Sequence, residues 1–302
     1  MLSILIPVYN FDCVVLVKEL HYQCMEAKIN FEILVLDDTS TQFKPENRII
    51  NELKHCYYIE STIHFGRAKI RNELGKRAKF ENLLFIDSDA FVDNPSFIRN
   101  YIENKDKANV IIGGMKYSDK PPKENALRWH YGSQREFIPA VTRNKTPYSS
   151  LISFNIMLKE SVFLEYPFNE DSIDIEKGGY GHEDTLLGLE LKKNNISVIH
   201  LDNQLVHDYH ESNEGFLKNS LTAVEKYVYN PQFQKREVVA QIKIFRVFEK
   251  VKTYRLIGVL SYIYQKFGNR IKERLFRPDP SIRMFDIYRL SYLSFYYQTR
   301  RK

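Results

Sequence analysis

Three apolar runs in the N-terminal third of the chain each end in polar side chains that could hold a charged ligand. The polar segments are Pro7-Val8-Tyr9-Asn10, Asp37-Asp38 and Asp87-Ser88-Asp89. One acidic pair alone is typical of a turn or a helix cap. Three such segments at successive run ends indicate a binding site, in which carboxylates and a divalent cation face a diphosphate.

Phosphate neutralisation has to come from side chains and a metal, because the sequence contains no GxGxxG or GxxxxGK[ST] loop. Arg67 and Arg71 lie one predicted helix before the second acidic segment and could supply positive charge. The alternative for both arginines is a solvated helix face.

Alternating short apolar runs and amphipathic stretches predict βαβ units and a mostly parallel sheet in an α/β fold. In such sheets ligands bind outside the carboxyl ends of the strands, so the three polar segments should meet in one crevice. The predicted strands are 2–8, 31–36, 57–59, 82–86, 110–112, 152–158 and 197–201, and the predicted helices are 14–27, 67–78, 95–103, 182–194 and 214–230. Residues 115–150, which contain four prolines and many charges, indicate an irregular insertion.

Four segments in this order resemble the family 2 glycosyltransferases, which have the GT-A fold. They are IPVYN, LVLDDTS, GRAKIRN and FIDSDAFV, within residues 1–115. Thr39 stands where that family usually has glycine, so the turn after Asp38 is expected to differ slightly, because threonine disfavours positive φ.

The resemblance implies a role for each motif residue. Asp87 should approach the ribose, and Asp89 should hold Mg²⁺ or Mn²⁺ on the diphosphate. The remaining nucleotide-sugar contacts that we expect are Pro7, Val8, Tyr9, Asp38, Arg67, Arg71 and Ser88.

The segment Gly178-Gly179-Tyr180-Gly181-His182-Glu183-Asp184 is a second candidate site. A carboxylate in the first turn of a helix is stabilised in its ionised form, which suits a general base, although acidic first turns are common in any protein. The segment resembles the GWGxED-type motif of inverting galactosyl- and N-acetylgalactosaminyltransferases of the chondroitin-polymerase-like type, with Tyr180 in place of Trp. This resemblance implies that Asp184 is the catalytic base and that Glu183 binds donor or acceptor hydroxyls.

The same resemblance implies that a downstream histidine completes the metal shell. His207 is our first choice because it directly follows a short apolar run, and His210 is the alternative.

These motifs predict a metal-dependent, inverting transfer of a hexose or N-acetylhexosamine from a UDP-sugar to a saccharide or lipid-linked acceptor. Bacterial surface polysaccharide synthesis is the expected context by family analogy. UDP-galactose, UDP-N-acetylgalactosamine and UDP-glucose all remain open as donors.

Charge is distributed unevenly along the 302 residues. Residues 231–302 contain 17 basic and 5 acidic residues, whereas residues 1–230 contain 27 basic and 33 acidic residues. We therefore expect a catalytic domain over 1–230, with a donor half (1–115) and an acceptor and base half (116–230), followed by a basic, aromatic, helical tail. The tail indicates peripheral membrane contact or packing on the catalytic domain.

The sequence has no apolar run long enough to span a membrane, no recognisable signal peptide and three unpatterned cysteines. These features predict a cytoplasmic protein, with the inner face of the plasma membrane as the site of any membrane contact. The acidic body argues against nucleic acid as a partner. The alternative functions are a non-catalytic glycosyltransferase-like binding protein and a nucleic-acid- or membrane-binding protein that acts through the tail.

Overall fold

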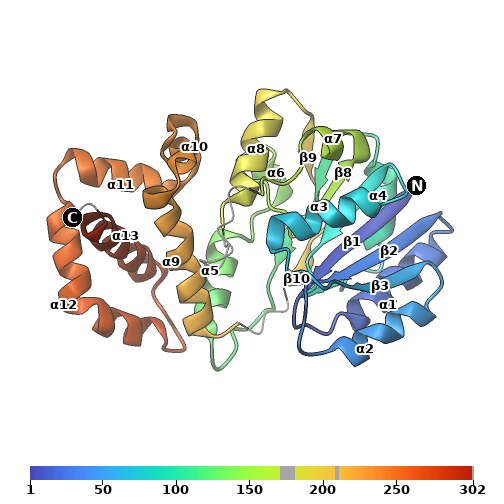
Figure 1. The fold of residues 1–302 in the computed structure, drawn as a ribbon, viewed down its shortest axis with the longest axis horizontal. Helices are drawn as coiled ribbons and strands as arrows, with labels where there is room; N and C mark the ends of the chain where they lie inside the picture. The colour runs from blue at the N-terminus through green and yellow to red at the C-terminus, as the bar shows by residue number, and fades with distance from the viewer. Residues whose placement is uncertain (171–180, 208–210, 301–302) are drawn as a thin grey trace. The chain divides into compact units, whose positions relative to one another are not determined.

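The computed structural model describes residues 1–170, 181–207 and 211–300, which form two compact units (Figure 1). The described residues of unit 1 are 1–117, 137–170 and 186–207, and those of unit 2 are 118–136, 181–185 and 211–300. The division into a catalytic domain over 1–230 and a tail stays a prediction.

Unit 1 is built on a seven-stranded sheet with the order β3-β2-β1-β4-β8-β6-β9. All neighbouring strands are parallel except β8, which is antiparallel to β4 and β6. The predicted α/β class and mostly parallel sheet are confirmed. The strands are β1 (Leu2–Val8), β2 (Phe31–Asp37), β3 (Cys56–Glu60), β4 (Asn82–Ile86), β6 (Val110–Ile112), β8 (Asn155–Lys159) and β9 (Val198–His200).

The register of the central strands brings their carboxyl ends to one edge. Val8 at the end of β1 lies opposite Asp37 at the end of β2, and Leu5 of β1 lies opposite Phe85 of β4. The residues that follow these strands therefore start from neighbouring positions, as the sequence predicts.

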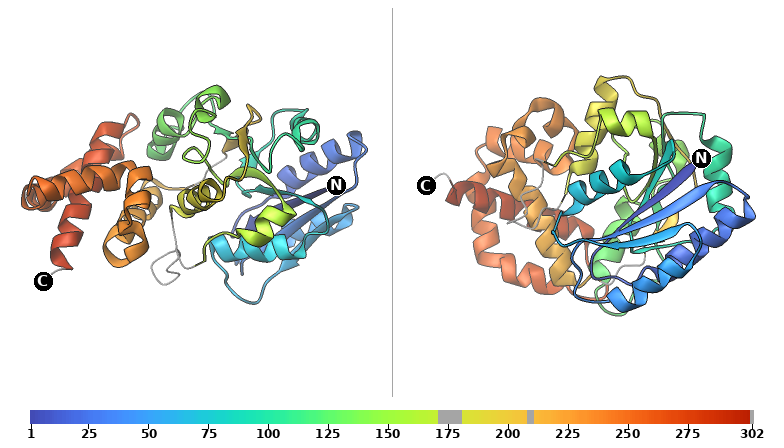
Figure 2. Two further views of the ribbon diagram at one scale, coloured as in Figure 1. Left: turned by 90° about the horizontal axis from the view of Figure 1, so that it is seen from above. Right: turned by 45° about the vertical axis from the view of Figure 1, so that its right-hand side comes forward.

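Apolar side chains cover both faces of this sheet. On one face lie α3 (Arg67–Arg77), α7 (Glu160–Glu165) and the apolar side of α8 (Glu183–Lys193), whose Leu74, Phe163 and Leu191 belong to one core cluster with strand residues. Strand residues of the opposite parity, such as Ile4, are also fully buried, which fits the uniformly apolar runs in the sequence. Helices α1 (Val14–Glu26) and α3 lie on opposite sides of the strands (Figure 2).

Gln23 joins α1 to α4 (Phe97–Asn104) through its side-chain amide. It donates to the Asn94 carbonyl at 2.9 Å and accepts from the Ile98 amide at 3.0 Å. The other short elements of this unit are α2 (Lys44–Arg48), η1 (Ile49–Glu52) and α6 (Ala140–Arg143).

A small three-stranded sheet in unit 1, with the order β5-β10-β7, was not predicted. Strand β10 (Leu205–His207) runs antiparallel to β5 (Ala90–Phe91) and parallel to β7 (Met115–Lys116). These strands have two or three residues each, too few for a period-two pattern to show in the sequence. This small sheet places His207 opposite Ala90, which directly follows the Asp-Ser-Asp segment.

The expectation of an irregular insertion over residues 115–150 is partly wrong. The segment contains β7, α5 (Ala126–Arg135) and α6. Its prolines flank these helices rather than interrupt them, and Pro139 lies directly before α6.

Unit 2 is helical. Its core contains Phe216 and Leu217 from α9, Leu127 from α5, Leu275 from α12 and Phe285 from α13. The predicted tail therefore consists of several helices, and among them α12 and α13 share a core with α9 rather than lie alone. The helices that follow α5 are α9 (Asn213–Tyr229), η3 (Pro231–Gln234), α10 (Arg236–Gln241), α11 (Lys243–Thr253), α12 (Ile257–Leu275) and α13 (Ile282–Thr299).

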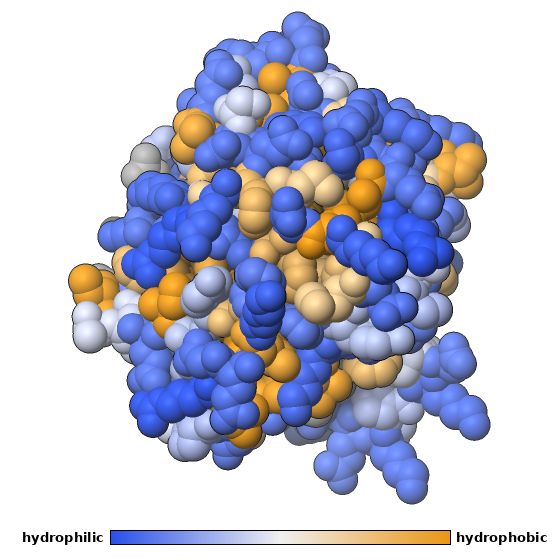
Figure 3. All heavy atoms as spheres, turned by 90° about the vertical axis from the view of Figure 1, so that its right-hand side faces the viewer, coloured by the Kyte–Doolittle hydropathy of each residue, from blue (hydrophilic) through white to orange (hydrophobic). Residues whose placement is uncertain are grey.

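Among the residues that the structure describes, no helix is both long enough and apolar enough to cross a membrane. On the face drawn in Figure 3, hydrophilic residues surround smaller areas of apolar side chains.

Candidate functional site

Asp38 is held by the start of helix α3. Its two carboxylate oxygens accept hydrogen bonds from the backbone amides of Phe65 and Gly66, at 2.5 and 2.9 Å. Its own amide donates to the carbonyl of Val8 at 2.8 Å. Asp38 is 5 % exposed, so these bonds fix its side chain at the point where β1, β2 and α3 meet.

An exposed tyrosine packs against the histidine that contacts this acid. Tyr9 is 54 % exposed, and its ring centroid lies 5.5 Å from that of His64. His64 Nδ1 is 3.2 Å from Asp38 Oδ2. An exposed tyrosine beside a fixed carboxylate provides a stacking surface and a hydrogen-bond acceptor for a planar heterocycle.

The turn after Asp38 keeps a left-handed residue although it contains no glycine. Thr39 has φ of +66°, so the expected change in this turn is not seen in its backbone conformation. Ser40 donates its amide to Asp37 Oδ1 at 2.8 Å, and the Thr39 hydroxyl donates to the Asp38 carbonyl at 2.5 Å. These contacts offset the strain that a β-branched residue has at positive φ.

The Asp-Ser-Asp segment turns directly after β4. The Asp87 amide donates a hydrogen bond to the Phe154 carbonyl at 3.1 Å, and the Asp87 carbonyl accepts one from the Ala90 amide at 3.2 Å. Arg71, which is 3 % exposed, forms an ion pair with the Asp87 carboxylate and also donates to the Arg67 carbonyl at 3.0 Å. The solvated-face alternative is therefore wrong for Arg71.

Asp89 meets His207 at this edge. Asp89 Oδ2 lies 3.1 Å from His207 Nε2, with the histidine side chain 10 % exposed and the aspartate 33 % exposed. The rings of Tyr117 and Phe154 lie 5.7 and 5.2 Å from the imidazole. The structure thus brings together the two residues that we predicted as metal ligands, although 118 positions separate them in the sequence.

The donor set of this pair fits a divalent cation. A carboxylate oxygen and an imidazole nitrogen suit Mn²⁺, and Mg²⁺ is usually held by one or two protein ligands together with substrate phosphates and water. Within the described residues, no group of three or more His, Cys, Asp or Glu side chains could hold an ion. A metal here would therefore need the diphosphate oxygens of a donor to complete its shell.

The remaining predicted donor residues are also located on unit 1. Arg67 is exposed at the first position of α3, after Gly66, whose φ is +76°. The other three, Pro7, Val8 and Ser88, lie on or directly after β1 and β4, and Val8 is buried. Their roles stay predictions.

The predicted base residues belong to unit 2. Glu183 and Asp184 form the first turn of α8, and Glu183 is 5 % exposed. Before them, Gly181 has φ of +95° and its carbonyl accepts from Lys226 Nζ at 2.5 Å. Their catalytic roles stay predictions, and residues 178–180 and His210 lie outside the described residues.

His182 packs against two aromatic rings of the same unit. Its ring centroid lies 5.9 Å from that of Phe233 and 5.2 Å from that of Phe245. Burial, with a smaller contribution from the Lys226 charge, lowers the pKa of His182 to about 3. The residue before the two carboxylates is therefore neutral at pH 7.

Sequence reasoning missed His64 and the buried polar network behind the acidic segment. His64 precedes the GRAKIRN motif by two residues, and this proximity is the only signal of it in the sequence. In the network, Asn155 on β8 accepts from the Tyr101 hydroxyl at 2.6 Å and donates to the carbonyls of Gly114 and Asn203. Asn155 thus joins β8 to the segments that lead into and out of the small sheet.

The family model described as "Glycosyl transferase family 2" matches residues 3–166, more than half of the chain. A curated relative, the poly(ribitol-phosphate) beta-glucosyltransferase of Bacillus spizizenii, is 31% identical over 128 residues, which are 38% of this chain and 19% of the relative. An uncharacterized glycosyltransferase of Haemophilus influenzae is 32% identical over 97 residues, 31% of this chain and 38% of that protein. The chain therefore matches less than half the length of each curated relative.

Two solved structures share the fold. Residues 1–349 of TarS from S. aureus align with a TM-score of 0.50 and 16% identity, covering 99% of this chain and 91% of that one. The mannosyltransferase PcManGT from Pyrobaculum calidifontis, solved with GDP-Man and Mn²⁺, aligns with a TM-score of 0.59 and 13% identity, covering 97% and 85%. The predicted GT-A fold is confirmed.

Proposed function

Because the chain belongs to glycosyl transferase family 2, we propose that it transfers a hexose or N-acetylhexosamine from a UDP-sugar to a saccharide or lipid-linked acceptor. The observation that carries this proposal is the arrangement at the edge of the sheet. There, Tyr9 and Asp38 are suited to bind the nucleotide base of the donor. The Asp89–His207 pair, with its 3.1 Å separation, is suited to a metal on the diphosphate.

The acceptor proposal is supported by the relative from B. spizizenii, whose name specifies a poly(ribitol-phosphate) acceptor. A polyol-phosphate or similar cell-surface polymer is therefore our first choice of acceptor class. Galactose, N-acetylgalactosamine and glucose remain the candidate sugars.

In the proposed mechanism the chain's own residues first bind the donor. Tyr9 stacks on the base, the Asp38 carboxylate accepts a hydrogen bond from it, and Asp87, held by Arg71, accepts from the ribose. Mn²⁺ or Mg²⁺, when bound by Asp89 and His207, would neutralise charge on the diphosphate.

Asp184 removes the proton from an acceptor hydroxyl. The hydroxyl oxygen then forms a bond to the anomeric carbon as the bond from that carbon to the UDP oxygen breaks. One such displacement inverts the anomeric configuration, and UDP leaves with the bonding electron pair. Glu183 binds a donor or acceptor hydroxyl.

The test measures UDP affinity of the full chain by calorimetry with Mn²⁺, with Mg²⁺ and with a chelator. It is followed by a screen of UDP-sugars for slow donor hydrolysis. We expect UDP binding that needs the metal, and hydrolysis of one sugar class. Metal-dependent UDP binding without hydrolysis or transfer would favour the non-catalytic alternative. No UDP binding, with binding of oligonucleotides instead, would overturn the donor site.

We further propose that the protein acts in the cytoplasm at the inner face of the plasma membrane. Within unit 2, α12 and the turn before it expose large apolar side chains: Tyr254 (72 %), Val259 (56 %), Tyr262 (60 %) and Phe267 (40 %). Exposed cations flank them, namely Arg255, Lys266 and Arg270. Such a surface complements an anionic leaflet, because tyrosine suits the interface and the cations attract lipid headgroups.

A further inference from the structure

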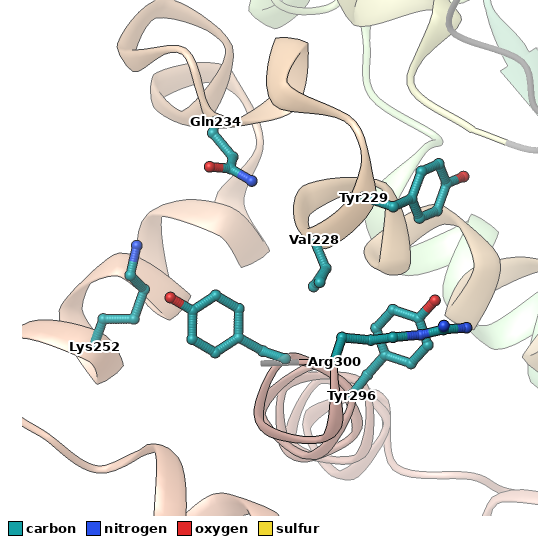
Figure 4. Close-up of a pocket in the computed structure, with 7 residues that line it drawn as sticks. Val228, Tyr229, Gln234, Lys252, Tyr296 and Arg300 are labelled. Atoms are coloured by element: carbon teal, nitrogen blue, oxygen red, sulfur yellow. The ribbon is translucent and has the colours of Figure 1, made fainter. Parts of the chain in front are cut away.

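A pocket in unit 2 has a lining unlike the donor site. It is lined by the ends of α9 and α13 together with η3 and α11, and its volume is about 360 Å³. Small-molecule sites begin at roughly this size. The lining residues are Val228, Tyr229, Gln234, Lys252, Tyr296, Tyr297 and Arg300. Figure 4 shows Tyr296 and Arg300 side by side from α13, with Lys252 and Gln234 across the space.

The positive charge that this pocket offers to a ligand comes from Arg300. The described residues that line the pocket include two cations and no acid, but Lys252, one of the cations, is paired with Glu249. The Lys252 ammonium donates to Glu249 at 3.0 Å and to the Tyr227 hydroxyl at 2.9 Å, and it lies 5.8 Å from the Tyr297 ring centroid. These contacts fix the position of the ammonium, while Arg300 is exposed and lies 5.4 Å from the ring centroid of Tyr296.

The aromatic side chains give the pocket flat apolar walls with polar edges. Tyr296 stacks against Tyr292 with ring centroids 6.0 Å apart and planes at 27°, which fixes the ring orientation. Tyrosine rings pack against the C–H faces of a sugar or polyol, and their hydroxyls form hydrogen bonds with its hydroxyls. A planar guanidinium beside such a ring binds phosphate or carboxylate oxygens in pairs.

We propose that this pocket binds an acidic saccharide, a sugar or polyol unit that carries a phosphate or carboxylate. It would hold a part of the acceptor that does not itself react. The choice of a saccharide rests on the proposed glycosyltransferase function, whereas the acidic group follows from the exposed Arg300 guanidinium beside the Tyr296 ring. An acceptor held in this way has at least one acidic unit near the unit that receives the sugar.

The experiment compares three oligomers of similar length binding to the full chain by calorimetry. They are a glycerol-phosphate hexamer, a hyaluronan hexasaccharide and the neutral maltohexaose. We expect at least one acidic oligomer to bind and maltohexaose to bind more weakly. Comparison of the phosphate and carboxylate oligomers identifies which acid the pocket takes.

Arg300→Gln and Tyr296→Leu test whether the binding occurs in this pocket. Each substitution should lower the affinity for the acidic oligomer by roughly three- to tenfold, since one charged hydrogen bond or one stacking contact is lost. Arg246→Gln on α11 is the matched control, because Arg246 is exposed, does not line the pocket and changes the net charge equally. Circular dichroism of each variant checks that the helices are intact.

The proposal is overturned if no acidic oligomer binds or if maltohexaose binds with the same affinity as the acidic oligomers. It is also overturned if Arg246→Gln lowers the affinity as much as Arg300→Gln does. Metal-dependent UDP affinity is measured on the same preparations. If UDP binds and the oligomers do not, the pocket proposal fails while the proposed donor site stands. If oligomers bind at this pocket and UDP does not, the donor site fails instead.

Discussion

Each of the two units holds a neutral histidine, but by different means. In unit 1, His200 has Nδ1 2.8 Å from an Arg143 nitrogen and Nε2 2.9 Å from the Pro147 carbonyl, so both ring nitrogens are hydrogen-bonded. In unit 2, the His182 ring packs against the rings of Phe233 and Phe245. Hydrogen bonds thus position the His200 ring, whereas aromatic packing positions the His182 ring.

This difference suggests a division of labour. A network fixed by strand ends suits a diphosphate, which needs charges at set positions. A helical unit with tyrosines and cations at its surface suits larger and more variable ligands, such as a polymer or a lipid surface. If the units divide donor binding from the acceptor steps in this way, substitutions in unit 1 should change UDP affinity and substitutions in unit 2 should change turnover or acceptor binding.

The largest effect is expected at Asp184 in unit 2. Asp184→Asn keeps the size of the side chain but cannot accept a proton, so turnover should fall by ~10²–10⁴-fold. UDP affinity should stay within about twofold, because the donor residues belong to unit 1. Glu190→Gln, an exposed change on the same helix, serves as the control in a steady-state transfer assay. A loss of less than about tenfold would contradict the base assignment and direct the test to Glu183.

The next effect is expected at the Asp89–His207 pair in unit 1. Asp89→Asn should weaken Mn²⁺-dependent UDP binding on the order of a hundredfold, because a charged interaction contributes up to about 3 kcal/mol. His207→Ala, which removes a neutral ligand, should weaken it about tenfold. Calorimetric titration with UDP and Mn²⁺ measures both. Asp93→Asn is the control, since Asp93 pairs with Lys116 instead.

Unchanged UDP affinity in Asp89→Asn would refute the donor site. If His207→Ala lowers UDP affinity more than Asp89→Asn does, and Asp93→Asn leaves it unchanged, the histidine is the stronger ligand. His210→Ala distinguishes the two histidines and should have the smallest effect of these variants.

The sequence predicts the donor side well because its chemistry follows strand ends. Once β1, β2 and β4 are recognised as buried runs, parallel pairing brings Tyr9, Asp38 and Asp87 to one edge. The position of His207 is harder to predict, since it depends on a three-residue strand that pairs with a two-residue strand. The sequence identifies His207 only through a family resemblance, and the structure supplies the contact.

The helical unit shows where sequence reasoning ends. Its helices are visible as apolar residues at three- and four-residue steps, but periodicity does not say which apolar side chains pack and which stay exposed. Phe285 and Tyr262 both belong to the apolar pattern, yet Phe285 is fully buried and Tyr262 is 60 % exposed. The pocket near Arg300 likewise arises from four separate helical segments.

The two histidines predict a pH dependence of stability. Burial lowers the pKa of His200 to about 4, with Arg143 contributing, and that of His182 to about 3, from an ordinary value of 6.5. The unfolded chain therefore binds protons that the folded chain does not, and stability falls as pH decreases below 6.5. The His200 site alone should lower the free energy of unfolding by about 2 kcal/mol between pH 7 and pH 5.

Urea unfolding from pH 7 to pH 5 measures this loss. His200→Gln should remove the part of the slope that belongs to unit 1, and His182→Gln the part that belongs to unit 2. If the variants unfold with the same pH slope as the parent chain, the histidines are not the cause. If only one variant changes the slope, the other histidine is protonated in the folded chain.

The smallest effect is expected on the exposed face of α12. Lys266→Gln and Arg270→Gln should each reduce binding to vesicles of anionic lipid by about fivefold, because one cation near such a surface contributes roughly 1 kcal/mol. Tyr262→Ser should also weaken binding, since it removes an interfacial ring. Arg236→Gln, an exposed change on α10, controls for net charge.

Co-sedimentation with anionic and neutral vesicles, at low and high salt, measures this binding. A membrane contact requires that the full chain pellets with anionic vesicles and that high salt releases it. It also requires that the α12 variants are released at lower salt than the parent chain, and that Arg236→Gln is not. Equal effects of Arg236→Gln and Lys266→Gln would indicate general attraction to positive charge rather than a defined face. If the full chain does not pellet at low salt, the tyrosines and cations of α12 have another partner, and unit 2 contributes through its acceptor residues alone.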